Sequence, residues 1–163
     1  MMGVSMTRRE LMAAGAGIVA AASLPRDGRG ESMPVMKIDR IETFPFSYPT
    51  VGRFKFFEGP RGEPLGRPTV VVKITAEDGT VGWGQSVPTN KWSYETPETV
   101  RTTIDRYLAP VLIGRNAFDI DAIHGAMNQI IAPSFSTGQP ICKAGIDLAL
   151  FDLTGKLLKQ TAA

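Results

Sequence analysis

Two segments of the chain combine cations with aromatic side chains, a composition suited to binding an anionic substrate under an apolar cover. The first lies within Ser47–Arg67, a stretch of about 20 residues that exceeds the usual loop length of about 12–15. Loops of this length are commonly functional lids, and glycines within the stretch supply hinges. The lid candidates are Arg53, Phe54, Lys55, Phe56, Phe57 and Glu58. We expect a substrate lid here, with a surface insertion as the alternative.

The second segment, residues 87–95, follows a predicted strand and contains Lys91, Trp92 and Tyr94. The two aromatic rings could form the wall of a pocket while Lys91 pairs with a substrate carboxylate. Packing of both rings against the domain itself would explain the same residues equally well. Both interpretations stay open at this point.

The chain contains one histidine, His124, and one cysteine, Cys142. A single histidine argues against a His-based metal site, and a single cysteine excludes an internal disulfide. His124 lies beside the apolar stripe of a predicted helix, where we expect a surface or hydrogen-bonded structural role. Cys142 is expected to be a small buried apolar residue.

Two acidic residues, Asp147 and Asp152, lie on one predicted helix, with Lys143 and Lys156 each four residues away from one of them. A spacing of four residues favours ion pairs along the helix. Carboxylates five residues apart on a helix point about 140° away from each other, which is too divergent to bind one metal ion. We therefore expect no metal site on this helix.

The elements that carry these residues begin with strands. Residues 69–76 alternate in polarity as a half-buried strand does, and Asp78-Gly79 favours a tight hairpin turn. A partner strand follows at 81–85, where glycines at alternate positions would let another backbone or a ligand approach closely. In an earlier strand, Val35–Pro45, the spacing between successive apolar residues changes from two to three, which predicts a bulge. Pro45 is expected to end this strand. Together these segments predict a three-stranded antiparallel meander.

Three helices are predicted after the strands. Thr96 caps the first, which begins at Pro97 and is expected to close at Pro110 and Gly114. Asp119 caps the second, whose end is expected to be set by Pro133.

The third helix begins at Pro140 and is expected to span Ile141–Gln160. Its apolar residues occupy most of its circumference, with Leu148, Phe151 and Leu158 lying outside the main stripe. Such a helix must be covered on more than one face. The sheet and two other helices would not cover it all, so the pattern predicts a missing partner.

Three stretches resemble the N-terminal capping domain of the enolase superfamily, in the mandelate racemase and muconate lactonizing enzyme group. They are Met36–Ile38, Val71–Ser86 and Ala144–Lys156. The resemblance implies an α+β fold over residues 35–160: a three-stranded antiparallel meander followed by a three-helix bundle. It also implies that the catalytic (β/α) barrel of the family is absent from this chain, with residues 161–163 as a truncated end.

In that family the capping domain closes over a barrel, which supplies three carboxylates for magnesium and the groups that remove a proton beside a substrate carboxylate. The resemblance thus implies no catalytic residue and no cofactor in this chain, and magnesium in the intact enzyme. It implies that the two segments above contact a small carboxylate substrate, and that the intact enzyme could be a homo-oligomer. Dehydration of a sugar acid or hydroxy acid is the first expected reaction, followed by racemisation or epimerisation and by cycloisomerisation.

On this basis the expected function is that of a capping-domain fragment that is inactive alone. A standalone binding module that docks to a separate barrel protein is the alternative from another class. A non-functional remnant is a third.

The N-terminal segment, residues 1–25, has the order of a signal peptide. Arg8 and Arg9 precede an apolar stretch of about a dozen residues, too short for a bilayer span, which takes about 20. The arginine pair resembles a twin-arginine signal, which predicts a periplasmic or secreted protein with no membrane span. Residues 26–34 are expected to form a linker. A net charge of +2, without basic runs, argues against nucleic-acid binding.

Overall fold

The computed structural model describes residues 34–51, 58–63, 66–134 and 136–160. The predicted signal segment with Arg8 and Arg9, most of the predicted linker and residues 161–163 lie outside the described residues. The described domain begins at Pro34.

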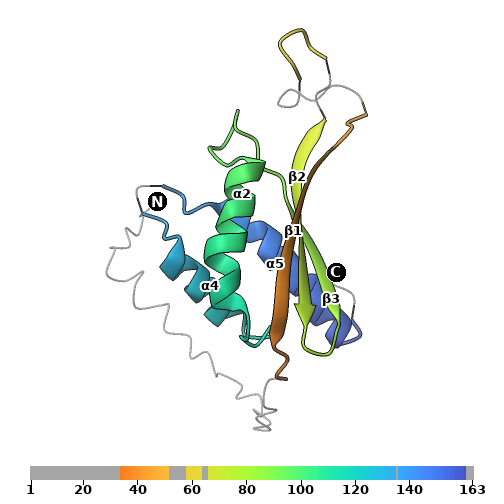
Figure 1. Ribbon diagram of the computed structural model, residues 1–163, viewed down its shortest axis with the longest axis vertical. Helices are drawn as coiled ribbons and strands as arrows, with labels where there is room; N and C mark the ends of the chain where they lie inside the picture. The colour runs from red at the N-terminus through yellow and green to blue at the C-terminus, as the bar shows by residue number, and fades with distance from the viewer. Residues whose placement is uncertain (1–33, 52–57, 64–65, 135, 161–163) are drawn as a thin grey trace, which may run out of the picture. The chain divides into compact units, whose positions relative to one another are not determined.

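The sheet is the predicted antiparallel meander of β1 (Ile38–Tyr48), β2 (Arg67–Ala76) and β3 (Val81–Ser86), in the order β1-β2-β3 (Figure 1). The hairpin between β2 and β3 turns at Gly79, whose φ of 86° favours glycine. Asp78 Oδ1 accepts a hydrogen bond from the N–H of Thr80 at 2.8 Å, which closes the turn locally. The prediction from the Asp-Gly pair is confirmed.

The first strand carries the predicted bulge but does not end where expected. The register shifts between Ile38 and Arg40, so Asp39 is the extra residue. The strand continues through Pro45 to Tyr48, with Pro45 opposite Val70. The prediction that Pro45 ends it was wrong because β1 is an edge strand, which tolerates a proline whose missing N–H would face away from the partner strand.

The first helical run also passes through a proline that was expected to close it. It consists of α2 (Pro97–Thr103), the π-helical turn η1 (Ile104–Leu108) and α3 (Ala109–Leu112). Pro110 cannot donate a backbone hydrogen bond, and its ring would clash with the preceding turn of an α-helix. The wider π turn, in which Ala109 N donates to Ile104 O, lies just before Pro110 and accommodates it. The run ends at Leu112, and Gly114, with φ 82°, closes the segment as predicted.

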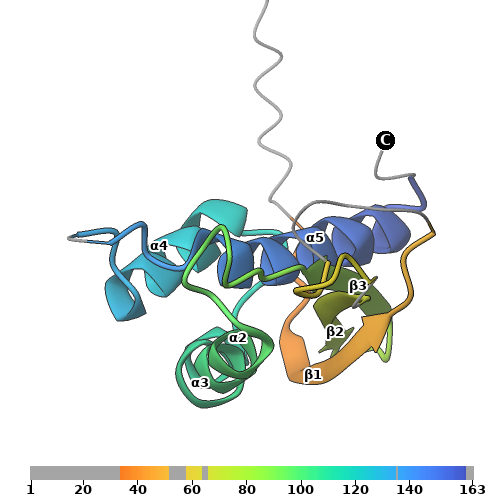
Figure 2. The same ribbon diagram turned by 90° about the horizontal axis from the view of Figure 1, so that it is seen from above.

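The remaining helices are α4 (Ile120–Ile130) and α5 (Pro140–Leu157). Asp119 caps α4 as predicted, because its Oδ1 accepts from Ala122 N at 3.1 Å. Seen from above, α5 crosses one face of the sheet, while α2 and α3 lie beside β1 (Figure 2). The fully buried core between the sheet and the helices contains Val70, Val72, Ile74, Ile104, Leu108, Ile123, Ile146, Leu150 and Leu153.

Glycines on the inner face of β3 determine how close α5 can come. A Cβ built on Gly84 would overlap the carbonyl oxygen of Gly145, and one on Gly82 would overlap that of Ala149. A Cβ on Gly145 would in turn overlap Ser86 Oγ. Of the two partners left open by the sequence, a backbone or a ligand, the structure shows the backbone of α5.

The outer side of α5 is not covered by the rest of the described domain. Leu148, Phe151 and the following Leu158 are all half-exposed. The expectation that the sheet and the other helices do not cover all of this helix is confirmed within the described residues.

Candidate functional site

The segment that follows β3 projects two aromatic side chains from the domain. Its backbone turns at Thr89, whose carbonyl accepts from Trp92 N at 3.1 Å and from Ser93 N at 2.7 Å. Trp92 is 76% exposed and Tyr94 is 68% exposed. Both residues therefore offer much of their surface to a substrate or partner.

Lys91 joins this segment to the loop between β1 and β2. Its Nζ donates to the carbonyl oxygen of Glu58 at 2.7 Å. The two loops leave the same end of the sheet, since the last residue of β1 and the last residue of β3 both pair near the start of β2 (Figure 1). The two cationic and aromatic segments therefore contact each other through Lys91. The sequence led us to expect that this lysine pairs with a substrate carboxylate.

The described part of the β1–β2 loop, residues 58–63, forms a tight turn. Gly59 N donates to Glu63 O at 2.8 Å, and Gly62 N donates to Gly59 O at 3.0 Å. Glu63 Oε2 also accepts from Arg61 N at 2.9 Å. The other lid candidates of this loop lie outside the described residues: Arg53, Phe54, Lys55, Phe56 and Phe57.

Glu95 is a buried structural anchor of the aromatic segment that the sequence did not reveal. Its side chain is buried, at 2% exposure, and its carboxylate accepts from Ile141 N at 2.9 Å and Cys142 N at 2.7 Å. These are free N–H groups of the first turn of α5, whose own N-cap residue, Gln139, has φ 54° and makes no side-chain cap. The carboxylate therefore caps α5 and anchors the end of the aromatic segment to it.

The lack of a capping residue before Pro140 was the available signal for this contact. A helix whose N-cap supplies no acceptor must find one elsewhere or expose its N–H groups to water. Which residue supplies it depends on tertiary contacts, so no local pattern points to Glu95.

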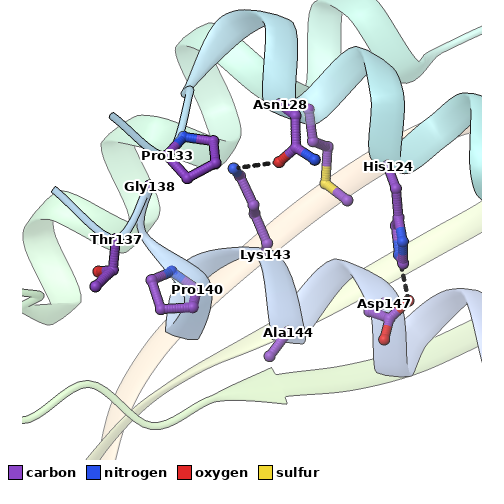
Figure 3. A pocket seen from close by; sticks show the side chains of 10 residues that line it. His124, Asn128, Pro133, Thr137, Gly138, Pro140, Lys143, Ala144 and Asp147 are labelled. Atoms are coloured by element: carbon purple, nitrogen blue, oxygen red, sulfur yellow. Dashed lines mark hydrogen bonds and ion pairs between the residues drawn. The ribbon is translucent and has the colours of Figure 1, made fainter. Parts of the chain in front are cut away.

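A hollow of about 320 Å³ lies between α4 and the start of α5 (Figure 3). His124 on α4 points toward Asp147 on α5, with Nε2 2.7 Å from Oδ1. The expectation of a hydrogen-bonded structural histidine is confirmed. Lys143 reaches the other way, and its Nζ donates to Asn128 Oδ1 at 2.8 Å and to Ile131 O.

The predicted ion pair between Lys143 and Asp147 was therefore wrong. Ile131, the residue that follows α4, presents its carbonyl oxygen to Lys143 Nζ. A cation is favoured at a helix C-terminus. Burial also lowers the pKa of Lys143. The polar side chains of this hollow thus link the two helices to each other, so we assign them a structural role.

The family model described as the mandelate racemase / muconate lactonizing enzyme, N-terminal domain, matches residues 65–163, which is more than half of the chain. The chain belongs to this family. The match includes β2, β3 and all the helices, and therefore both the segment with Trp92 and its anchor Glu95.

Curated members of the mandelate racemase / muconate lactonizing enzyme family align with the domain described here. N-succinyl-L-Arg/Lys racemase of Bacillus cereus is 33% identical over 125 residues, which is 77% of this chain and 32% of the racemase. Chloromuconate cycloisomerase of Cupriavidus necator is 38% identical over 96 residues, 58% of this chain and 24% of that enzyme. The chain thus spans about a third or less of the length of these relatives.

Solved structures of the family show the same fold. The N-succinyl Arg/Lys racemase structure from Bacillus cereus matches with a TM-score of 0.65 and 31% identity, over 76% of this chain and 31% of that one. Muconate lactonizing enzyme from Pseudomonas fluorescens, complexed with muconolactone, matches with a TM-score of 0.64 and 30% identity, over 77% and 32% of the two chains. The α+β meander-and-helix fold is that of the family's N-terminal domain.

The family domain described here contains no group of three His, Cys, Asp or Glu side chains that could hold a metal ion, over its described residues. Within the same ranges no helix is long and apolar enough to cross a membrane. Cys142 is buried as expected, and burial, followed by the nearby Glu95 carboxylate, raises the pKa of its thiol to about 12.

The second predicted ion pair on α5 is confirmed and has an additional role. Asp152 Oδ2 lies 2.6 Å from Lys156 Nζ and also accepts from Trp83 N at 2.8 Å. Lys156 Nζ donates to Val81 O at 2.9 Å. Two side chains of α5 therefore satisfy backbone groups along the outer edge of β3.

This pair predicts a pH dependence of stability. Burial raises the pKa of Asp152, but hydrogen bonds from Lys156 and from Trp83 N lower it more, so the pKa lies below its ordinary value of 3.8. A lowered folded-state pKa means that the ionised carboxylate stabilises the fold above the unfolded-state pKa, and that this contribution is lost as the pH falls through the folded-state pKa. Asp152→Asn should cost about 1 kcal/mol of unfolding free energy at pH 7 and flatten the loss of stability below pH 4.

Urea unfolding of both proteins between pH 2.5 and 7 measures this difference. Asp121→Asn, an exposed position in the first turn of α4, is the matched control and should retain the slope of the unmodified protein. Equal acid slopes for Asp152→Asn and the unmodified protein would contradict the prediction.

Proposed function

We propose that this domain is the substrate-capping domain of an enzyme of the racemase or cycloisomerase type that acts on a small carboxylate. The observation that carries the proposal is the hydrogen bond from Lys91 to Glu58, because it brings the two aromatic and cationic loops together at one end of the sheet. The exposed rings of Trp92 and Tyr94 beside it supply the apolar cover for a substrate. Arg53, Phe54, Lys55, Phe56 and Phe57 belong to the same proposed lid.

The relatives favour some reactions over others. Their printed names describe racemisation and cycloisomerisation, and a further relative is an L-Ala-D/L-Glu epimerase of Bacillus subtilis, 30% identical over 117 residues. Racemisation, epimerisation and cycloisomerisation therefore take precedence over dehydration of a sugar acid or hydroxy acid.

The catalytic groups and magnesium belong to the barrel in this proposal. The described residues contribute binding, orientation and exclusion of water, and none of them is a catalytic residue. The chain alone should neither turn over substrate nor bind magnesium with micromolar affinity. A standalone module that docks to a separate barrel protein remains the alternative, and it would use the exposed apolar side of α5 as its interface.

A chimera tests the capping role. Residues 34–160 replace the matching N-terminal third of the Bacillus cereus racemase, and racemisation of N-succinyl-L-Arg is measured with and without a magnesium chelator. The chimera should be active only with the metal, and Trp92→Ala should lower kcat/KM about tenfold, because an aromatic contact of about 1.4 kcal/mol is lost. Tyr107→Ala, a similarly exposed aromatic on η1, is the matched control and should leave kcat/KM unchanged. A folded chimera no more active than the isolated barrel would refute the proposal.

Export is a separate part of the proposal. We propose that Arg8 and Arg9 direct the protein through the twin-arginine route to the periplasm or medium. A reporter fused after residue 34 should appear in the periplasmic fraction, and the double change Arg8→Lys with Arg9→Lys should keep it in the cytoplasm. Equal periplasmic amounts of both fusions would overturn this route.

A further inference from the structure

The aromatic segment, residues 87–95, is attached at both of its ends to one residue of α5, Cys142. Just before the segment, Ser86 Oγ donates to the carbonyl oxygen of Cys142 at 3.3 Å. At the end of the segment, Glu95 Oε2 accepts from the N–H of Cys142 at 2.7 Å. The segment is therefore a loop whose two ends lie together on the first turn of α5, and closed loops of this kind are frequently functional.

Both attachments are buried. Ser86 is 1% exposed, Glu95 is 2% exposed and Cys142 is fully buried. Ser86 is also bound to β2, because Thr69 Oγ1 donates to its carbonyl oxygen at 2.9 Å. A carboxylate that accepts from backbone N–H groups forms charge-assisted hydrogen bonds, and a negative charge is favoured at a helix N-terminus. Glu95 is thus the stronger of the two attachments.

Hydrogen bonds inside the segment connect Glu95 to the two aromatic residues. Ser93 Oγ accepts from Glu95 N at 3.3 Å and donates to Thr89 O at 3.2 Å. Thr89 O also accepts from the N–H of Trp92. Trp92 and Tyr94 are themselves largely exposed, so burial of their rings contributes little to holding them. The place of both rings therefore depends on where the backbone is held.

We infer that Glu95 is a positioning residue for substrate binding: its carboxylate, with Ser86 as the second attachment, holds the aromatic segment on α5 so that Trp92 and Tyr94 meet the substrate in a fixed place. This inference rests on the proposed function, because it takes the substrate, a small carboxylate, from it. Glu95 acts through the rings, since both of its carboxylate oxygens are bound to α5. An aromatic contact that is fixed beforehand loses less conformational entropy on binding than a mobile one.

The motion of Trp92 in the 163-residue chain is the first measurement. Trp83→Phe leaves Trp92 as the only tryptophan, so the nanosecond decay of fluorescence anisotropy reports on the aromatic segment alone. Glu95→Gln replaces one acceptor oxygen by an amide group that cannot accept from an N–H. It should increase the amplitude of the fast decay about twofold.

Two further variants frame this result. Ser86→Ala removes the other attachment without changing the charge, and it should increase the fast decay by a smaller factor. Glu98→Gln, at an exposed acid in the first turn of α2, is the matched control and should leave the decay unchanged. An unchanged decay in both Glu95→Gln and Ser86→Ala would overturn the inference.

The chimera described above supplies the second measurement. Glu95→Gln should raise KM about fivefold and leave kcat within about twofold, because a displaced binding contact weakens substrate binding. The same change is then made in a chimera that lacks both rings, through Trp92→Ala with Tyr94→Ala. There it should raise KM less than about twofold, because a residue that acts through the rings has no further effect once they are removed. Glu98→Gln should leave KM unchanged in both chimeras.

The outcomes separate this inference from the proposed function. An active chimera in which Glu95→Gln leaves KM unchanged, or raises it equally with and without the two rings, would overturn the inference and leave the proposed function intact. A folded chimera no more active than the isolated barrel would refute the proposed function and, with it, this role of Glu95. Ser86→Ala is compared in the same way and should raise KM by a smaller factor, so the inference stays testable if Glu95→Gln fails to fold.

Discussion

Gly84→Val is expected to lower the unfolding free energy of the domain by about 3 kcal/mol or more. Valine is a better strand residue than glycine, so local propensity alone would predict stabilisation of β3. The structure reverses this sign because a Cβ at position 84 would overlap the carbonyl of Gly145 and the backbone of Ala149. Backbone atoms of a packed helix cannot move aside as a flexible side chain can. The loss would be a large part of the roughly 5–15 kcal/mol that stabilises a typical domain.

Chemical denaturation of the 163-residue chain measures this effect. The matched control is Gly125→Ala, on the exposed side of α4, where an added Cβ meets no atom within 4 Å. That change should stabilise the domain by about 0.5–1 kcal/mol, because alanine is the better helix former. Gly84→Ala adds only the Cβ atom and so introduces the smallest steric overlap with α5. If this variant were as stable as the unmodified chain, α5 would not pack this closely on β3.

Glu95→Ala should cost about 2–4 kcal/mol of unfolding free energy. The change removes the acceptor for the N–H groups of Ile141 and Cys142, and leaving a buried donor without a partner costs about 1–3 kcal/mol each. The start of α5 should loosen in consequence, so the thiol of Cys142 should react faster with a disulfide reagent. Loss of the nearby carboxylate should also bring the pKa of that thiol down from about 12.

Denaturation and thiol reactivity of the same variants check this result. Glu98→Ala removes an exposed acid from the first turn of α2 and should cost less than about 1 kcal/mol without exposing Cys142. Glu95→Gln keeps one acceptor oxygen and should lie between the two. If Glu95→Ala and Glu98→Ala had equal effects, Glu95 would not act as the cap of α5.

Both effects depend on α5, which packs on Gly84 and whose first turn is capped by Glu95. Its first turn is held by Glu95, at the end of the segment that presents Trp92 and Tyr94. Its outer side carries Leu148 and Phe151.

The sequence by itself determined the features that depend on near neighbours along the chain. The alternation around Val72, the Asp78-Gly79 turn and the caps at Thr96 and Asp119 all depend on contacts within a few residues. Each was predicted and each is found. The family resemblance of the hairpin and the last helix led to the fold class, which the family match confirms. The apolar outer side of α5 could also be predicted from the sequence, because apolar residues occupy most of the circumference of this helix.

Only the tertiary structure decided the features that depend on which elements lie side by side. Pro45 continues a strand because that strand lies at an edge, and Pro110 is accommodated by a π turn within a packed helical run. Lys143 bonds to the end of α4 instead of Asp147, and Glu95 caps a helix that begins 45 residues later at Pro140. For Lys143 and Glu95 the local pattern allows more than one partner, and the packing of elements distant in sequence selects among them.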